Sequence, residues 1–436
     1  MANNAEFPKE WTIVSLERDC VLISGLRPKG GASDEGIPSL GGEHITLDGR
    51  INFSDVNAKY IPEKFFKIMT KGKAEENDIL INKDGANTGK VAILKKKFYK
   101  DIAINEHLFI LRSKKLFVQQ YLFYWLFSRF GQKQITDRIT GSVQPGLSST
   151  FIKNFLVPRP PLSEQRKIAE ILETIDNAIE KTDKIIEKYK RIKQGLMQDL
   201  LTKGVVSEGE GESERWRLRD EKIDKFKDSP LGRIPEEWEV VLTSEFCESI
   251  TDGTHDTPKP TDSGIPLLTS KNIKENKLDM REFYNISERD AKVINKRSYI
   301  SDNTLLFSMI GTIGNMVAIE KKDFEFCVKN VGIFRVKNRE NLRWLYYSLS
   351  FYFPLYVKTL LDGTSQDFIS LGNLKNILIP LPPLPEQQRI ASILSQIDEV
   401  IEKEQAYKEK LERIKKGLME DLLTGKVRVN HLIEEE

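Results

Sequence analysis

Two long segments of the chain place apolar side chains at alternating steps of three and four residues on a charged background. Residues 157–205 and residues 379–427 both show this pattern, which predicts a long amphipathic helix in each. The positions expected to form an apolar seam are Ile168, Leu172, Ile175, Ile179, Ile186 and Leu196 in the first segment, and Ile390, Leu394, Ile397, Ile401, Leu411 and Leu418 in the second.

Residues at the ends of these segments favour helix boundaries. Ser163 and Pro385 follow two prolines and a leucine, and they are favoured as an N-cap and a first helical residue. Gly204 and Gly425 are plausible stops. A helix of about 40 residues is roughly 60 Å long, whereas a 150-residue domain has a radius of gyration of about 15 Å. We therefore expect an antiparallel pair; the alternative is that each helix folds back on its own domain.

The chain is an internal repeat. With a constant shift of 222 positions, 28 of 49 residues are identical between 157–205 and 379–427. Weaker matches lie upstream, where Asn-Glu-His-Leu-Phe (105–109) corresponds to Asn-Val-Gly-Ile-Phe (330–334). A duplication that diverged unequally implies two similar tasks on two different targets.

The repeat divides the chain into five parts. Residues 1–156 and 234–378 are the variable domains, 157–205 and 379–436 carry the long helices, and 206–233 has the composition of a charged, solvated linker. Each variable domain mixes helical segments with short β-rich runs. The predicted strands are 78–82, 91–94 and 108–111 in the first domain, and 304–307, 316–319 and 332–336 in the second.

Composition restricts the class of protein further. The chain of 436 residues has 67 basic and 65 acidic residues, so overall charge neither requires nor excludes nucleic acid. Residues 1–156 lean basic, with 23 Lys and Arg against 17 Asp and Glu, whereas 234–378 have 18 against 20. The three cysteines have no metal-site spacing, and Cys20 and Cys247 are interpreted as buried apolar residues. No signal peptide or membrane span is expected, which favours the cytoplasm.

Catalytic patterns are missing from the sequence. Residues 85–91 differ from a phosphate-binding loop in glycine spacing and carry Val91 where Ser or Thr is needed. No histidine has metal-binding spacing, so neither a metal nor a cofactor is expected. The aromatic runs 121–127 and 344–347 favour buried helices over a stacking platform for unpaired bases.

Polar, glycine-rich loops remain as candidate DNA contacts. Arg and Lys can bond guanine, Asn and Gln can bond adenine, and hydroxyls can bond phosphates; ordinary hydrophilic turns are the alternative for each residue. The candidates are Arg27, Lys29, Lys83, Asn87, Thr88, Lys90 and Gln144 in the first domain, and Thr254, His255, Lys259, Ser308, Thr312, Asn315 and Gln366 in the second.

The duplicated Pro-Pro-Leu-x-Glu-Gln-x-x-Ile-Ala helix, with its closing Glu-Arg-Ile-Lys-Lys-Gly-Leu-Met-Glu-Asp-Leu-Leu-Thr-Gly-Lys-Val-Arg-Val, resembles the conserved regions of type I restriction–modification specificity subunits. The segment 228–238 resembles the entry to that family's second target-recognition domain. The resemblance implies two α/β target-recognition domains separated by two long antiparallel coiled-coil helices with pseudo-twofold symmetry. Each domain would recognise half of a bipartite double-stranded DNA site.

The resemblance also implies partners. Modification subunits that carry S-adenosylmethionine would dock on the helices, which set the spacer, and ATP-dependent restriction subunits that use Mg²⁺ would join them. The chain itself would be non-catalytic. Two other hypotheses are a coiled-coil scaffold that does not recognise DNA and a self-contained nuclease or methyltransferase.

Overall fold

The computed structural model describes residues 7–141, 145–209, 215–274, 276–361 and 368–433. The chain forms two compact units, each combining one α/β domain with parts of two long helices. Unit 1 comprises Met1–Asp183 and Ala406–Glu436, and unit 2 comprises Lys184–Gln405. Within the described ranges, no helix has the length and apolar character needed to cross a membrane.

Unit 1 is built around a four-stranded antiparallel sheet of order β2-β8-β5-β6. A three-stranded sheet (β4-β3-β7) and two strand pairs (β1-β11 and β9-β10) accompany it. The strands are β1 (Thr12–Ser15), β2 (Cys20–Ser24), β3 (Ile37–Leu40), β4 (Tyr60–Ile61), β5 (Ile79–Asn82), β6 (Val91–Ile93), β7 (Ala103–Ile104), β8 (Leu108–Ser113), β9 (Ile139–Thr140), β10 (Gly146–Leu147) and β11 (Leu156–Arg159). The helices are α1 (Leu16–Asp19), α2 (Glu63–Ile68), α3 (Gln119–Phe127) and α4 (Arg129–Thr136).

Unit 2 repeats this topology. Its four-stranded sheet has the order β17-β25-β22-β23, and its three-stranded sheet is β21-β18-β24. The strands are β16 (Glu239–Leu242), β17 (Ser249–Asp252), β18 (Ile265–Thr269), β19 (Ile273–Lys274), β20 (Lys277–Leu278), β21 (Tyr284–Ile286), β22 (Thr304–Ser308), β23 (Met316–Ile319), β24 (Cys327–Lys329), β25 (Val331–Arg335) and β26 (Leu378–Leu381), of which β16 pairs with β26 as β1 pairs with β11. The helices are α6 (Thr243–Phe246), α7 (Glu288–Ser298), α8 (Arg339–Leu361) and α9 (Leu371–Lys375).

The central strands are buried on both faces. Ile79 and Ile81 of β5 pack in one core with the aromatic residues of α3, whereas Leu80 lies in a second core on the opposite face of the sheet. The strands predicted near 78–82, 91–94, 108–111, 304–307, 316–319 and 332–336 are confirmed. The aromatic runs are buried helices, as predicted, because Tyr121, Trp125 and Trp344 are almost fully buried.

The two long helices are α5 (Leu162–Thr202) and α10 (Leu384–Leu423). α5 begins two residues and α10 one residue before the predicted start, so Ser163 is not an N-cap and Pro385 is not the first helical residue. At the start of α5, the carbonyl groups of two prolines accept the hydrogen bonds of the first turn instead. The backbone N–H of Gln165 donates to the Pro161 carbonyl (2.9 Å), and its side-chain Nε2 donates to the Pro160 carbonyl (2.9 Å). Beyond the helix ends, Gly204 (φ +64°) and Gly425 (φ +71°) adopt the left-handed conformation expected of helix stops.

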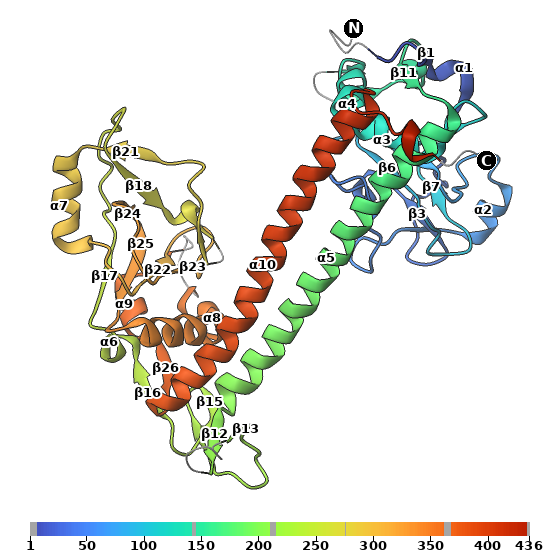
Figure 1. Cartoon of the computed structure of the whole chain (residues 1–436). Helices are drawn as coiled ribbons and strands as arrows, with labels where there is room; N and C mark the ends of the chain where they lie inside the picture. The colour runs from blue at the N-terminus through green and yellow to red at the C-terminus, as the bar shows by residue number, and fades with distance from the viewer. Residues whose placement is uncertain (1–6, 142–144, 210–214, 275, 362–367, 434–436) are drawn as a thin grey trace. The chain divides into compact units, whose positions relative to one another are not determined.

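Ion pairs define how the helices pair within each unit. In unit 1, Asp176 contacts Lys415 and Asp183 contacts Lys408, each at 2.6 Å, so the segments run antiparallel. In unit 2, Lys193 contacts Asp398 at 2.6 Å, which is the Asp176–Lys415 pair displaced by the 222-residue shift. Figure 1 shows α5 in green and α10 in red.

The apolar seam packs against both the other helix and the local domain. Ile168 and Leu172 share one core with α3 residues and with Leu422 of α10. Both predicted packings therefore occur in unit 1: the long helices pair with each other, and α5 also packs against its own domain. The buried seam positions are Ile168, Leu172, Ile179, Ile186, Ile390, Leu394, Ile401 and Leu411, whereas Ile175, Leu196, Ile397 and Leu418 are half-buried.

The segment 206–233 is not a plain solvated linker, which corrects the prediction. It contributes to two β-hairpins, one of β12 (Val205–Glu208) with β13 (Arg215–Leu218) and one of β14 (Phe226–Ser229) with β15 (Gly232–Pro235). The charged composition did not predict these hairpins, because contacts that stabilise them come from residues far away in the sequence. Arg219, which follows β13, is buried against a carboxylate of α10.

Candidate nucleic-acid interface

Three chain connections meet at one end of the four-stranded sheet in each unit. In unit 1, the last residues of β2 and β5 pair with the first residues of β8. In unit 2, the ends of β17 and β22 pair with the start of β25 in the same way. We call this sheet end, with the loops after β2 or β17, after β5 or β22 and before β8 or β25, the candidate edge.

A glycine brings two of these connections close together in each unit. A Cβ added to Gly25 would lie 1.9 Å from the Asn105 carbonyl oxygen, and one added to Gly253 would lie 2.3 Å from the Val328 carbonyl oxygen. Only glycine fits such an approach. Polar residues of both loops are therefore held side by side.

The candidate edge of unit 1 carries a cluster of charged side chains from all three connections. Arg27 Nη1 lies 3.2 Å from Glu106 Oε1, and Lys83 Nζ donates to the Glu106 carbonyl (2.9 Å). His107 Nδ1 lies 2.5 Å from Asp84 Oδ1. Two predicted cations, Arg27 and Lys83, are thus brought together around one glutamate.

The other candidates in unit 1 shape the turn between β5 and β6. Asn87 Nδ2 donates to the Gly42 carbonyl (3.0 Å), Lys90 Nζ donates to Asn87 Oδ1 (2.5 Å), and Thr88 Oγ1 donates to the Pro145 carbonyl (3.0 Å). These three half-buried side chains hold the turn in place. Lys29 is exposed, and Gln144 lies outside the described residues.

Unit 2 presents different chemistry at its candidate edge. His255 Nε2 lies 2.8 Å from Asp252 Oδ2, and Arg297 Nη2 lies 2.8 Å from Asp252 Oδ1. His255 Nδ1 lies 3.0 Å from Asn330 Oδ1. A buried aspartate therefore orients an exposed histidine and an exposed arginine.

The remaining candidates of unit 2 are dispersed. Lys259 and Thr312 are exposed, and Thr254 forms a backbone bridge with Lys329. Asn315 donates to the Ile273 carbonyl (3.1 Å), a structural bond. The prediction of Ser308 as a DNA contact is corrected, because Ser308 is fully buried in β22 and cannot reach a surface ligand. Gln366 lies outside the described residues.

Sequence reasoning did not identify several residues of the candidate edges. These are Asp84, Glu106, His107, Asp252 and Asn330, together with Arg297 of α7, which contacts Asp252. The repeat match of 105–109 with 330–334 covers Glu106, His107 and Asn330, but position in the repeat alone does not show that these side chains meet polar residues of the other loops. In the parts of the chain that the structure describes, no group of three or more His, Cys, Asp or Glu could hold a metal ion.

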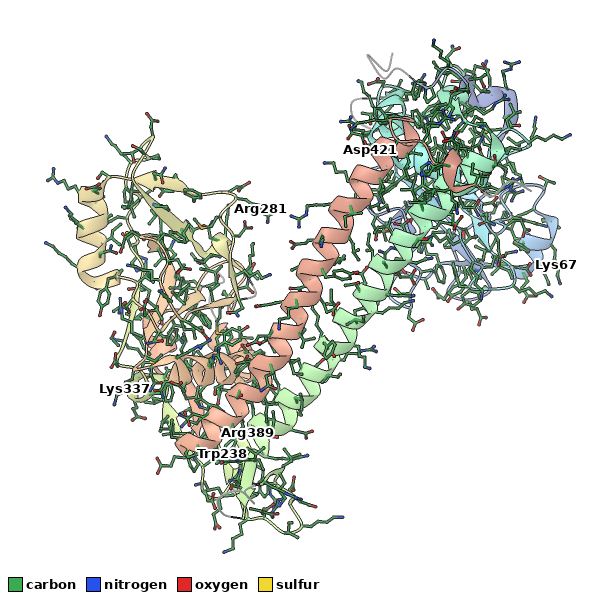
Figure 2. All side chains as sticks on the ribbon, in the orientation of Figure 1. Lys67, Trp238, Arg281, Lys337, Arg389 and Asp421 are labelled. Atoms are coloured by element: carbon green, nitrogen blue, oxygen red, sulfur yellow. The ribbon has the colours of Figure 1, made fainter. Side chains whose placement is uncertain are left out.

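A matching cluster attaches each domain to the start of a long helix. In unit 1, Glu164 accepts a bond from Trp11 Nε1 (3.1 Å) and from Arg428 Nε (2.7 Å). In unit 2, Glu386 accepts from Trp238 Nε1 (3.1 Å) and Arg219 Nη2 (3.0 Å). Figure 2 labels Trp238 near the start of α10. The arginines come from non-equivalent positions: Arg219 follows β13 in unit 2, and Arg428 follows α10 in unit 1.

The electrostatics of these clusters follow from burial and pairing. Burial opposes the charge of Arg219, but its bonds to Glu386 outweigh this and raise its pKa. The Glu164 bond raises the pKa of Arg428. Farther along the helices, burial and then the neighbouring Asp176 and Asp398 raise the pKa values of Tyr124 and Tyr347, which donate to these aspartates at 2.7 Å. The four groups keep their charged or protonated forms at neutral pH.

Comparison with known proteins gives one family. The family described as "Type I restriction modification DNA specificity domain" matches residues 51–190 and 235–413. The chain belongs to this family. The type I restriction enzyme MjaVIII specificity subunit of Methanocaldococcus jannaschii is 31% identical over 438 residues, which cover 98% of this chain and 95% of that protein.

Further relatives of the specificity family agree in extent and fold. The putative type I restriction enzyme MjaX specificity subunit of the same organism is 31% identical, covering 97% of this chain and 95% of that protein. The crystal structure of the type I S subunit from M. genitalium covers 97% of this chain and 98% of that chain, with a TM-score of 0.60 at 15% identity. The fold is therefore shared by specificity subunits of low sequence identity.

Proposed function

We propose that this chain is the sequence-specific DNA-recognition subunit of a type I restriction–modification complex, and that each α/β domain recognises one half of a bipartite site. Its role is recognition and not catalysis, in keeping with the specificity subunits of its family. The observation that carries the proposal is the repeated topology with different polar side chains at equivalent candidate edges. One scaffold presents two different chemistries, which suits two different half-sites.

The chemistry of each candidate edge suggests how it meets DNA. Arg27, oriented by Glu106, offers donors suited to guanine O6 and N7 in the major groove, and Lys83 adds a second cation. In unit 2, His255 and Asn330 offer an imidazole and an amide, the latter suited to adenine. Arg297 supplies a cation for phosphate.

The long helices offer one docking surface in each unit for modification subunits. Tyr407 and Ile414 of α10 are exposed in unit 1, and Ile185 and Ile192 of α5, their mates in the repeat, are exposed in unit 2. Both pairs are seven residues apart, so each forms an apolar stripe on one helix face. An apolar stripe that is repeated in both units suits two copies of one partner. Restriction subunits would join that assembly.

Several parts of the function rest on family membership. The helices would set the spacer between the half-sites. S-adenosylmethionine, ATP and Mg²⁺ would be bound by the partner subunits, with no cofactor on this chain. The complex would act in the cytoplasm on double-stranded DNA.

A methylation map tests the proposal. Native long-read sequencing of host DNA, with this gene intact and deleted, should show the loss of one bipartite adenine-methylated motif on deletion. An unchanged map, with the modification subunit present, would favour a scaffold that does not recognise DNA. Methyl transfer or Mg²⁺-dependent cleavage by the purified chain alone would favour the enzymatic alternative.

A further inference from the structure

The connection between β6 and β7 in unit 1 combines lysines with exposed aromatic rings. Residues 95–101 read Lys-Lys-Lys-Phe-Tyr-Lys-Asp, four cations against one carboxylate. Lys97 pairs with Glu75 at 3.0 Å, whereas Lys96 and Lys100 are exposed and have no ion pair with any described residue. We call residues 95–100 the basic-aromatic loop.

Aromatic packing holds this loop in a defined place. Phe98 and Tyr99 are 42% and 48% exposed. Their rings lie 5.3 Å and 6.2 Å from the ring of Phe53, which also contacts Tyr60 at 5.8 Å. Large rings that stay exposed on a rigid base are typical of a contact surface.

The equivalent connection in unit 2 has the opposite charge balance. Residues 320–326, between β23 and β24, read Glu-Lys-Lys-Asp-Phe-Glu-Phe, two cations against three carboxylates. There Glu320 pairs with Arg339 (2.6 Å) and Arg343 (2.7 Å), and Lys322 pairs with Glu325 (2.6 Å). Three of its five charged residues are therefore held in ion pairs within unit 2. In unit 1, Lys95 also lies 4.0 Å from Asp176. Because the same fold forms with either charge balance, Lys96 and Lys100 of unit 1, which have no ion pair within the described residues, are not needed for folding.

We propose that the basic-aromatic loop contacts phosphates and sugars of duplex DNA beside the first half-site, without recognising bases. This rests on the DNA-recognition function proposed above. Only β6, three residues and about 10 Å long, separates the loop from the turn after β5 at the candidate edge, a distance within one helical turn of DNA, about 34 Å. Lysines supply the phosphate contacts, and the rings pack on the sugars.

Salt dependence of DNA binding tests this inference. The assembled complex with its modification subunits is titrated with a duplex carrying the mapped motif and with one of unrelated sequence, at several salt concentrations. Removal of two phosphate contacts by Lys96→Ala with Lys100→Ala should make the slope of log affinity against log salt shallower by about 1.8. Both duplexes should be affected equally, and the methylated motif should stay unchanged.

A matched control removes the same charge from unit 2. Lys321→Ala with Lys337→Ala deletes one lysine of the equivalent connection and the exposed Lys337, labelled in Figure 2, and should leave the slope unchanged. An unchanged slope for the Lys96 and Lys100 variant would overturn the inference. So would loss of assembly with the modification subunits at an unchanged slope, because the loop would then contact an acidic protein surface. Failure of the proposed function differs, since the wild-type complex would then have no motif.

Discussion

Glu164 and Glu386 anchor equivalent clusters in the two units, but the arginines that bind them are not equally buried. The side chain of Arg219, which binds Glu386, is 5% exposed, whereas that of Arg428, which binds Glu164, is 27% exposed and also contacts Glu10. An unpaired cation is more costly in the drier setting. The two clusters therefore differ in what the loss of the carboxylate costs.

Glu386→Gln should destabilise the chain by about 3 kcal/mol because it leaves the buried Arg219 with only the exposed Glu237, 3.2 Å away, as a counter-charge. Glu164→Gln should cost roughly 1 kcal/mol because solvent and Glu10 still serve Arg428. Thermal unfolding of the two variants measures the difference. Equal losses of stability in the two variants would show that burial of the arginine does not determine how much the carboxylate contributes to stability.

Arg27→Ala should relax base preference at one position of one half-site, since a bidentate arginine contact discriminates by about 1–3 kcal/mol. His255→Ala should instead relax the other half-site. Methylation maps of cells carrying each variant distinguish these outcomes. Relaxation of the same half-site by both variants would contradict the assignment of one candidate edge to each half.

Part of each candidate edge could be predicted from sequence. Arg27, Lys83 and His255 stood out because their residue types suit bases and phosphates in polar loops. Glu106 and Asp252 did not, because a carboxylate that orients a cation is recognisable only after the fold brings distant loops together. Ser308 was misplaced because burial at a strand end depends on the neighbouring sheet.

At the scale of elements, periodicity predicted most of the structure. Continuous apolar runs gave the strands buried on both faces, and three-four spacing gave α5 and α10. The hairpins of 205–235 were missed because their residues are charged and their stabilising partners, such as Glu386 for Arg219, lie far away in the sequence.

Leu172→Asp should destabilise unit 1 by about 3 kcal/mol or more, because Leu172 is fully buried in a core that includes α3 and α10 residues. Methylation of the bipartite motif should fall because the domain that recognises its first half unfolds. Ile175→Asp, at a half-buried position one turn away, is the matched control and should cost less. A wild-type melting temperature for Leu172→Asp would contradict the packing.

A matched deletion tests whether the helices set the spacer. Removing residues 184–190 of α5 and 401–407 of α10 keeps the antiparallel register of Asp176 with Lys415 and of Lys193 with Asp398. Seven residues are two helical turns, so each helix shortens by about 10 Å, or about three base pairs. Mapping the methylated motif should show a shorter spacer between unchanged half-sites. An unchanged spacer would mean that other elements set it.

At the scale of the whole molecule, the repeat links sequence to function. Two domains of one topology diverged at their candidate edges while their helices stayed nearly constant. Each domain has its own core and its own cluster on a helix start. Such independence predicts that one domain can be exchanged without disturbing what the other recognises.

The most direct test is an exchange of residues 1–159 for the corresponding domain of another family member, followed by native long-read methylation mapping. The junction at Pro160 keeps β11 whole on β1. We predict a motif with a new first half and with the original spacer and second half. A change in both halves, or in neither, would contradict the claim that the two domains recognise the two halves independently.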